Sequence, residues 1–316
     1  MRCGQAHLRG LSKRNMPGGS ATRTFARAEC GRAGDNESVK LHTGTYEGVG
    51  GGRIFFRHWL PEEEARAVLV LVHGLGEHGG RYENVARHFS ARGYAVCAHD
   101  HPGHGKSDGV RSHIGRFSEL SQNLQAHVAR VRGSYPGRPM FLLGHSMGGL
   151  VALDYLLEEQ DGWAGAVLTG PALRPVRDTS PVRVWIGRIF SVVAPRVRIY
   201  RVDASTVCRD PEVVAAYRSD PLVFRGMVTA RLAAEILRVM RWMSGKAARI
   251  KLPLLIMQGG ADRVVDPEGA TWLGQAVDSR DKTLKIYEAM YHEILNEPEH
   301  GMVWQDIEMW LEKRMA

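Results

Sequence analysis

The stretch of sequence that decides the fold is MFLLGHSMGGL, residues 140–150. Its first four residues form an apolar run typical of a buried strand, and the residues from Gly148 onward are compatible with a helix. Between the two, residues 144–148 fit the pattern G-x-S-x-G, in which a serine stands at a sharp turn from a strand into a helix. Glycines flank this serine because bulkier residues would collide in so tight a turn. The stretch therefore predicts an exposed nucleophile, Ser146.

Outward from this stretch, strands and helices alternate along the chain. The expected strands are Val39–Tyr46, Arg53–Trp59, Ala67–His73, Tyr94–His99, Met140–Leu143, Gly165–Thr169, Pro253–Gln258 and Thr283–Tyr287. The expected helices are about Arg81–Ala91, Phe117–Val131, Gly148–Leu157 and Met302–Lys313. Strands that alternate with helices of this size predict an α/β fold with a mostly parallel central sheet and helices on both of its faces.

Two parts of the chain depart from this rhythm. Residues 171–247 are helix-rich, contain several prolines and have no obvious buried strand, so we expect a helical cap inserted over the carboxyl edge of the sheet, ahead of the strand at 253–258. Residues 1–38 carry seven basic residues against three acidic ones and lack apolar periodicity. We expect these residues to be a disordered basic tail, an organelle-targeting peptide, or a consequence of a start placed upstream of Met16. Residues 39–316 are then one domain.

Composition excludes several classes of protein. Half of the net charge of +8 lies in the first 38 residues, the rest is mild for the length of the remaining chain, and no clustered basic face is evident, so we expect no nucleic-acid partner. The longest apolar strand-like run, Ala67–Val72, is far short of a membrane span. The 4 cysteines form no pair of CxxC type, which predicts neither a zinc site nor a disulfide framework and fits a cytoplasmic location.

An activated serine needs a base and an acid, in the chain order serine, acid, histidine. Asp262 follows the expected strand at 253–258, and His292 follows the one at 283–287, so both stand at the carboxyl ends of strands, where open α/β sheets assemble their sites. We expect Asp262 to be the acid and His292 the base. Asp266 is the rival acid, and His300 fits the start of the final helix better than a catalytic position.

An acyl-transfer transition state also needs backbone N–H donors for its oxyanion. The amide of Met147, directly after the serine, is one expected donor. The other is the amide of Leu75, in the loop HGLGEH at residues 73–78 after the expected third strand. Glu77 and His78 in this loop lack a third metal ligand at suitable spacing. The histidine-rich segment at residues 99–108 fits a tight turn, in which Asp100 and Ser107 satisfy backbone groups, better than a zinc cluster.

With these motifs, the chain resembles the monoacylglycerol lipase and lysophospholipase branch of the α/β hydrolases. The resemblance spans about Tyr46 to the C-terminus, and HGLGEH is its most specific part. The other shared motifs are Arg81-Tyr82, the turn at 100–108, residues 144–149, 209–211, Tyr217, 220–223, 259–262 and 291–293. The resemblance implies an esterase whose substrate has one long acyl chain and a small polar head, such as a monoacylglycerol. It also implies no cofactor and no metal.

Other functions remain open at this stage. A lysophospholipase, a general carboxylesterase or acyltransferase, and a catalytically silent fold that binds lipid or protein are the alternatives. The expected cap offers apolar residues interleaved with arginines, which could rest transiently on a lipid surface or pack on the domain. The apolar residues are Val182, Val184, Trp185, Ile186, Ile189, Phe190, Val192 and Val193, and the arginines are Arg183, Arg188, Arg196 and Arg198. We therefore expect a cytoplasmic protein that can be peripheral to a membrane.

Overall fold

The computed structural model describes residues 39–176 and 181–315. The expected tail, residues 1–38, lies outside them. The central sheet has eight strands, in the order β1-β2-β4-β3-β5-β6-β9-β10. These strands are β1 (Lys40–Glu47), β2 (Arg53–Leu60), β3 (Ala67–Val72), β4 (Tyr94–His99), β5 (Met140–His145), β6 (Gly165–Thr169), β9 (Leu254–Gly259) and β10 (Lys282–Tyr287). Each of the eight expected strands is present, with ends that differ by at most two residues.

The pairing of the strands confirms the expected fold class. β1 pairs antiparallel with β2, and β2 antiparallel with β4, whereas every pair from β4 to β10 is parallel. The protein is thus an α/β fold with a mostly parallel sheet. In such a sheet the carboxyl ends of β5, β9 and β10 lie along one edge, so the residues that follow them can meet.

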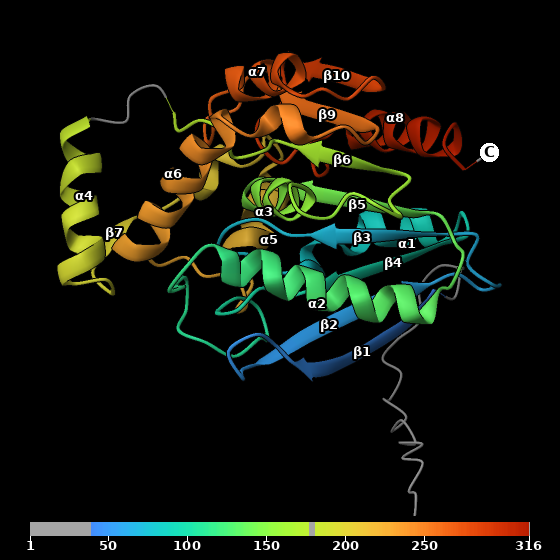
Figure 1. The fold of residues 1–316 in the computed structure, drawn as a ribbon, viewed down its shortest axis with the longest axis horizontal. Helices are drawn as coiled ribbons and strands as arrows, with labels where there is room; N and C mark the ends of the chain where they lie inside the picture. Colours follow the sequence, from blue (N-terminus) through green and yellow to red (C-terminus); the bar gives the residue numbers. More distant parts are fainter. Residues whose placement is uncertain (1–38, 177–180, 316) are drawn as a thin grey trace, which may run out of the picture. The chain divides into compact units, whose positions relative to one another are not determined.

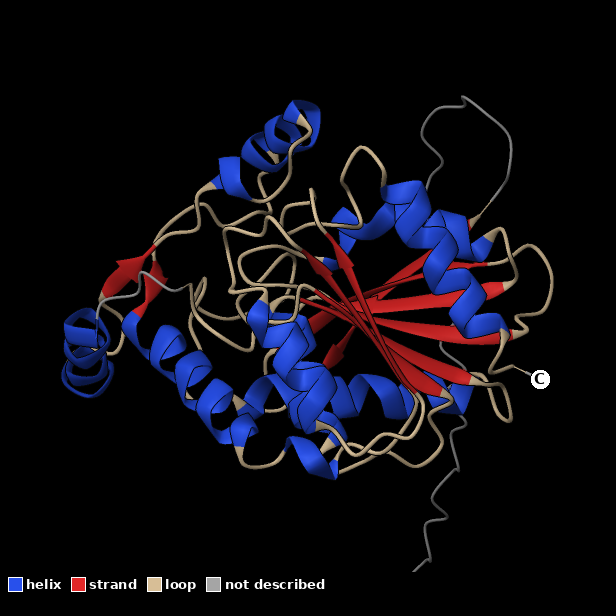
Figure 2. Ribbon diagram, turned by 90° about the horizontal axis from the view of Figure 1, so that it is seen from above, coloured by secondary structure: helices blue, strands red, loops and turns tan. Residues whose placement is uncertain are grey.

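Helices cover both faces of this sheet (Figures 1 and 2). In β3, Val68, Val70 and Val72 belong to one hydrophobic cluster, which includes residues of α2 (Ser118–Ser134) and α3 (Met147–Leu156). The alternate residues Leu69 and Leu71 belong to a second cluster, with α1 (Glu83–Ser90) and α8 (His300–Glu312). A strand buried on both faces needs a continuous apolar run, which explains the sequence of β3.

The helices that flank the sheet differ in two places from those expected from the sequence. The expected helix at 81–91 is a 3₁₀ turn, η1 (Gly79–Tyr82), followed by α1. In α2 the residues Leu120, Leu124, His127, Val128 and Val131, which recur at helical spacing, are buried. The sequence did not reveal α7 (Glu268–Ala276), because this short helix contains two glycines, which weaken helix propensity.

Residues 171–247, named here the 171–247 segment, hold a different set of elements. They are α4 (Pro181–Val193), β7 (Arg198–Tyr200), η2 (Ala204–Thr206), α5 (Pro211–Ser219), β8 (Val228–Thr229) and α6 (Ala230–Ser244), with η3 (Ala247–Arg249) at its end. The expectation of no buried strand was wrong, since β7 and β8 form a two-stranded antiparallel sheet and β8 is buried. A two-residue strand leaves no periodicity to detect. Figure 1 shows α4 beside α6, away from the central sheet.

Candidate active site

Ser146 stands at the turn between β5 and α3. Its backbone has φ 54° and ψ −121°, a strained conformation for a residue other than glycine. The turn is also crowded, because a Cβ added to Gly148 would lie 2.1 Å from the carbonyl oxygen of Val72. Only glycine fits at position 148, as the sequence pattern requires. The tight turn places Ser146 at the carboxyl end of β5, directly before the first residue of α3.

The structure brings together the three residues that the sequence predicts as nucleophile, base and acid. His292 Nε2 lies 2.8 Å from Ser146 Oγ, and His292 Nδ1 lies 2.7 Å from Asp262 Oδ2. The side chains of His292 and Asp262 are 5% and 0% exposed. Asp262 Oδ1 accepts hydrogen bonds from the amides of Val264 and Val265. The carboxylate is therefore held in one orientation against the imidazole.

The pKa shifts of Asp262 and His292 suit a histidine that accepts a proton from a serine. Burial alone would raise the pKa of Asp262, but the charge of His292 and the hydrogen bonds to the carboxylate lower it overall. Burial alone would lower the pKa of His292, but the Asp262 carboxylate, with the charges of Glu293 and Glu77, raises it above its usual value. Asp262 thus remains ionised, and His292 can accept a proton and stabilise the positive charge.

A second histidine, His145, lies directly beside this pair. Its ring centroid is 4.8 Å from that of His292, and its Nδ1 lies 3.1 Å from Thr169 Oγ1. Burial, followed by the charge of His292, lowers the pKa of His145 to about 4. His145 is therefore neutral at physiological pH, and a proton taken up in the site resides on His292. The sequence placed His145 in the elbow motif without revealing this packing.

Leu75 and Met147, the expected donors to an oxyanion, lie at the same place. Both line the cavity that contains Ser146. A Cβ added to Gly74 would lie 3.2 Å from Ser146 Cβ, so the loop before Leu75 approaches the serine closely. Among the described residues, neither amide donates a hydrogen bond to another protein group. Both amides are therefore available to a bound oxyanion.

The cavity at Ser146 has a volume of about 600 Å³, within the range of small-molecule sites. Residues of the 171–247 segment form much of its wall, and most of them are apolar, among them Ile186, Phe190, Ile199, Ile236, Leu237 and Met240. Of the expected apolar residues of α4, Ile186 and Phe190 line the cavity, whereas Trp185, Val192 and Val193 are exposed. The side chains of Val182 and Val184 lie outside the described residues.

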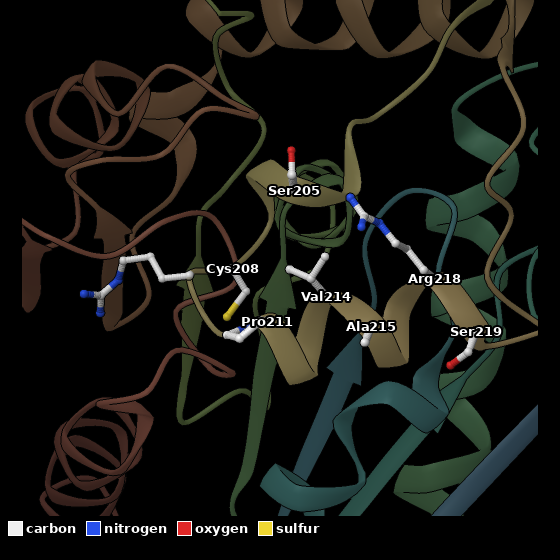
Figure 3. A pocket seen from close by; sticks show the side chains of 8 residues that line it. Ser205, Cys208, Pro211, Val214, Ala215, Arg218 and Ser219 are labelled. Atoms are coloured by element: carbon white, nitrogen blue, oxygen red, sulfur yellow. The ribbon is translucent and has the colours of Figure 1, made fainter.

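A second hollow, of about 530 Å³, lies beside α5 (Figure 3). Cys208 lies in it, and burial raises the pKa of this thiol to about 12, which leaves it a poor nucleophile. Arg209 pairs with Glu297 and Glu299. The cavity at Ser146 is therefore the better candidate for chemistry. The residues that line the second hollow are Ser205, Cys208, Arg209, Pro211, Val214, Ala215, Arg218 and Ser219.

The rival residues have structural contacts instead. Asp266 Oδ1 accepts a hydrogen bond from the amide of Glu268 at the start of α7. His300 begins α8, and its Nδ1 lies 2.7 Å from the carbonyl oxygen of Glu297. In the described part of the chain, neither residue forms a hydrogen bond or ion pair with Ser146 or His292.

Glu77 and His78, weighed in the sequence as a metal pair, have separate protein partners. Glu77 pairs with Arg81, and His78 Nε2 lies 2.8 Å from Asp220 Oδ2. The turn at 99–108 follows expectation, because Asp100 accepts hydrogen bonds from the amides of Gly79 and Lys106. Ser107 Oγ likewise accepts from the amide of Phe55 and donates to the carbonyl of Asp100.

Together, the α/β fold and the arrangement of serine, histidine and aspartate at the carboxyl edge of its sheet define a serine hydrolase. Residues 63–299 match the model of the serine aminopeptidase S33 family, and the chain belongs to this family of α/β hydrolases. This family match, together with the similar lipases described next, confirms the resemblance drawn from the motifs and the expectation of a carboxylic ester hydrolase.

Relatives of known activity are similar over most of the chain. A monoacylglycerol lipase of Mycolicibacterium smegmatis is 39% identical over 84% of this chain and 95% of its own length. A monoglyceride lipase of Homo sapiens is 36% identical over 84% of this chain and 89% of its own. The solved structure of a Paleococcus ferrophilus monoacylglycerol lipase has a TM-score of 0.74 and 31% identity, covering 87% of this chain and 99% of that one.

Proposed function

We propose that the chain hydrolyses a monoacylglycerol to glycerol and a fatty acid, through an acyl-enzyme on Ser146. The observation that carries the proposal is the chain of contacts from Asp262 through His292 to Ser146 Oγ, which opens into an apolar cavity of about 600 Å³. The activities named for the similar lipases support the same substrate class. An apolar cavity suits one acyl chain, whereas a small polar head can remain near the serine.

In the first half of the reaction, His292 Nε2 takes the proton of Ser146 as Ser146 Oγ attacks the ester carbonyl carbon. The carbonyl oxygen becomes an oxyanion, which accepts hydrogen bonds from the amides of Leu75 and Met147. The tetrahedral intermediate then expels the glycerol oxygen, which receives the proton from His292. Asp262 fixes the tautomer of His292 and stabilises its positive charge during this step.

In the second half, water replaces the glycerol. His292 takes one proton from this water, whose oxygen attacks the acyl carbon on Ser146. The oxyanion forms at the same two amides, and Ser146 Oγ leaves with the proton that His292 returns. The products are the fatty acid and the free enzyme, so each atom of the water is accounted for and no cofactor takes part.

We also propose that the 171–247 segment acts as a cap over the cavity and that α4 rests transiently on a lipid surface. Exposed apolar side chains of α4 support this, with Trp185, Val192 and Val193 at 62%, 75% and 70% exposure. Arg196 is exposed, as is Arg188 at the rim of the cavity that it lines, and both favour an anionic surface. Among the described residues, no helix is long and apolar enough to cross a membrane.

Fatty-acid release from a panel of esters tests the substrate. The panel holds 1- and 2-monoacylglycerols of several chain lengths, a triacylglycerol, a lysophosphatidylcholine and a short p-nitrophenyl ester, with phosphonate-inactivated enzyme as the blank. We expect kcat/KM for monoacylglycerols to exceed that for the lysophospholipid and the triacylglycerol by at least about tenfold. Turnover of the short ester alone would contradict the lipid assignment and leave an esterase.

A further inference from the structure

A buried ion cluster lies behind the candidate site. The guanidinium of Arg81 stands between two carboxylates, with Nη1 2.7 Å from Glu77 Oε2 and 2.6 Å from Glu293 Oε1. Its Nη2 lies 2.8 Å from Glu293 Oε2, so the contact with Glu293 is bidentate. The side chains of Arg81, Glu77 and Glu293 are 9%, 5% and 6% exposed. The cluster is thus largely buried, with Glu77 and Glu293 at the wall of the cavity that contains Ser146.

Glu77 connects this cluster to the loop that carries Leu75. Its Oε1 accepts a hydrogen bond from the amide of Gly74 at 2.6 Å and another from the hydroxyl of Tyr82, also at 2.6 Å. Gly74 directly precedes Leu75 in the chain. The position of the Leu75 amide therefore depends on where the carboxylate of Glu77 is held.

Glu293 connects the same cluster to the loop that carries the base, since it directly follows His292. The amide of Glu293 donates to the carbonyl of Val207 at 2.7 Å, and Asn296 Nδ2 donates to Glu293 Oε2 at 2.9 Å. Burial alone would raise the pKa of Glu293, but Arg81 lowers it to about 2, so the carboxylate is ionised. The guanidinium of Arg81 therefore forms its two hydrogen bonds with an ionised carboxylate in the loop that carries His292.

A structural role alone explains this cluster poorly. A buried ion pair gains little stability over well-packed apolar side chains, because desolvation of its charges offsets their attraction. What an arginine adds is a planar fork with fixed geometry, which a lysine cannot reproduce. The guanidinium carbon also lies 4.7 Å from the ring centroid of Tyr217 in α5, which limits its movement. The cluster is thus suited to fix the loop that carries Leu75 relative to the loop that carries His292.

We propose that Arg81 is a positioning residue for the hydrolysis: by bridging Glu77 and Glu293, it sets the Leu75 amide at a fixed place relative to His292. The inference rests on the proposed role of Ser146 as the nucleophile. Arg81 is not among the residues that line the cavity, whereas its partners Glu77 and Glu293 are, so Arg81 acts on the reaction through these two carboxylates. Displacing either loop by about 1 Å would misalign the oxyanion donor with the base, an error that costs on the order of 100-fold in rate.

The test compares Arg81→Lys with Arg87→Lys, a matched control. Arg87 pairs with Glu83 on the exposed face of α1 and keeps its charge in the variant, as Arg81 does. The measurement is the second-order rate of Ser146 phosphonylation by a fluorophosphonate, followed by intact-protein mass spectrometry. This reaction needs the base and the oxyanion donors but no lipid. Its result is therefore independent of the lipid panel, whose failure would remove only the substrate assignment.

We expect Arg81→Lys to slow phosphonylation by about 10- to 100-fold, with Arg87→Lys within twofold of wild type. Affinity for a trifluoromethyl ketone, which forms an oxyanion on the serine, should fall in parallel. An Arg81→Lys protein that reacts and binds within twofold of wild type, whatever its melting temperature, would overturn the proposal.

Glu293→Gln provides a second variant should Arg81→Lys fail to fold. It should slow phosphonylation at least about tenfold at pH 8. It should also move the acid limb of the pH–rate profile to lower pH, because the charge of Glu293 raises the pKa of His292. A normal rate with an unmoved acid limb would contradict a positioning role, since a merely structural contact would change only the melting temperature.

Discussion

In the proposed mechanism, Asp262 determines which nitrogen of His292 carries the proton, because its Oδ2 accepts from Nδ1 and leaves Nε2 free to accept the proton of Ser146. An asparagine has the same shape but can present its NH₂ group to the imidazole and favour the wrong tautomer. We predict that Asp262→Asn lowers kcat/KM on a p-nitrophenyl ester by about 10³- to 10⁴-fold.

The rival carboxylate serves as the control for this substitution. Asp266→Asn should leave kcat/KM within about threefold of wild type, since Asp266 contacts the start of α7 and not His292. Equal losses in the two variants would mean that Asp262 is not the orienting acid. Steady-state rates at pH 8, normalised to the fraction of enzyme that a phosphonate titrates, give the comparison.

At the scale of elements, the junction of β5 and α3 depends on Gly148. An added Cβ would meet the backbone oxygen of Val72, which no rotamer change can relieve. We predict that Gly148→Ala lowers the free energy of unfolding by about 3 kcal/mol or more. The matched control is Gly133→Ala in α2, where nothing lies near the added Cβ and helix propensity should add up to about 1 kcal/mol.

Urea unfolding of both glycine variants measures these changes. Equal stability of the two would show that β5 and α3 can move apart at little cost, and the strained geometry of Ser146 would then lack the constraint described above.

The exposed face of α4 makes a prediction about lipid surfaces. The double substitution Val192→Ser and Val193→Ser removes two apolar side chains that do not line the cavity. We predict that binding to vesicles containing phosphatidylglycerol weakens by about tenfold, in proportion to the apolar area lost. Co-sedimentation measures this binding.

The control for α4 is a double substitution on α8, Met302→Ser and Met309→Ser, at residues that are 51% and 48% exposed. Its binding to the same vesicles should match that of wild type. If both double variants bind as wild type does, α4 is not the contact surface.

At the scale of the whole molecule, buried neutral histidines make the fold sensitive to acid. Burial lowers the pKa of His99 to about 4 and that of His58 to about 3, against about 6.5 in an unfolded chain. Between pH 6.5 and 4 the unfolded chain therefore binds more protons than the folded protein. The free energy of unfolding thus decreases as the pH is lowered through this range. The pKa is lowered in four more buried histidines, and burial is the largest cause in each. They are His73, His101, His104 and His127.

Each such histidine contributes a loss of about 1.4 kcal/mol per pH unit in this window. We predict that the free energy of unfolding, measured in urea between pH 7.5 and 4.5, is level above pH 7 and falls steeply below 6.5. A level value down to pH 5 would mean that these histidines are hydrated or already protonated in the folded protein.

Most of the fold and the three candidate catalytic residues could be predicted from the sequence, because local patterns mark them. The apolar run of β3, the elbow at Ser146 and the strand-end positions of Asp262 and His292 each lie within a few residues of a recognisable signal. The pair Arg81–Glu293 could not be predicted, since 212 residues separate its members and only the fold brings them together. The strands β7 and β8 were missed for a different reason: they are too short to show a period.

The central claim is that Ser146 attacks the ester, and its replacement tests this most directly. Ser112→Ala is the matched control, because Ser112 is also a buried serine with a positive φ, of 55°. In the described part of the chain, Ser112 and Ser146 are the non-glycine residues that have a positive φ. We predict that Ser146→Ala lowers fatty-acid release from a 1-monoacylglycerol by about 10⁶-fold, whereas Ser112→Ala releases it within a few-fold of wild type. Retention of more than about one hundredth of wild-type turnover by folded Ser146→Ala would contradict the account.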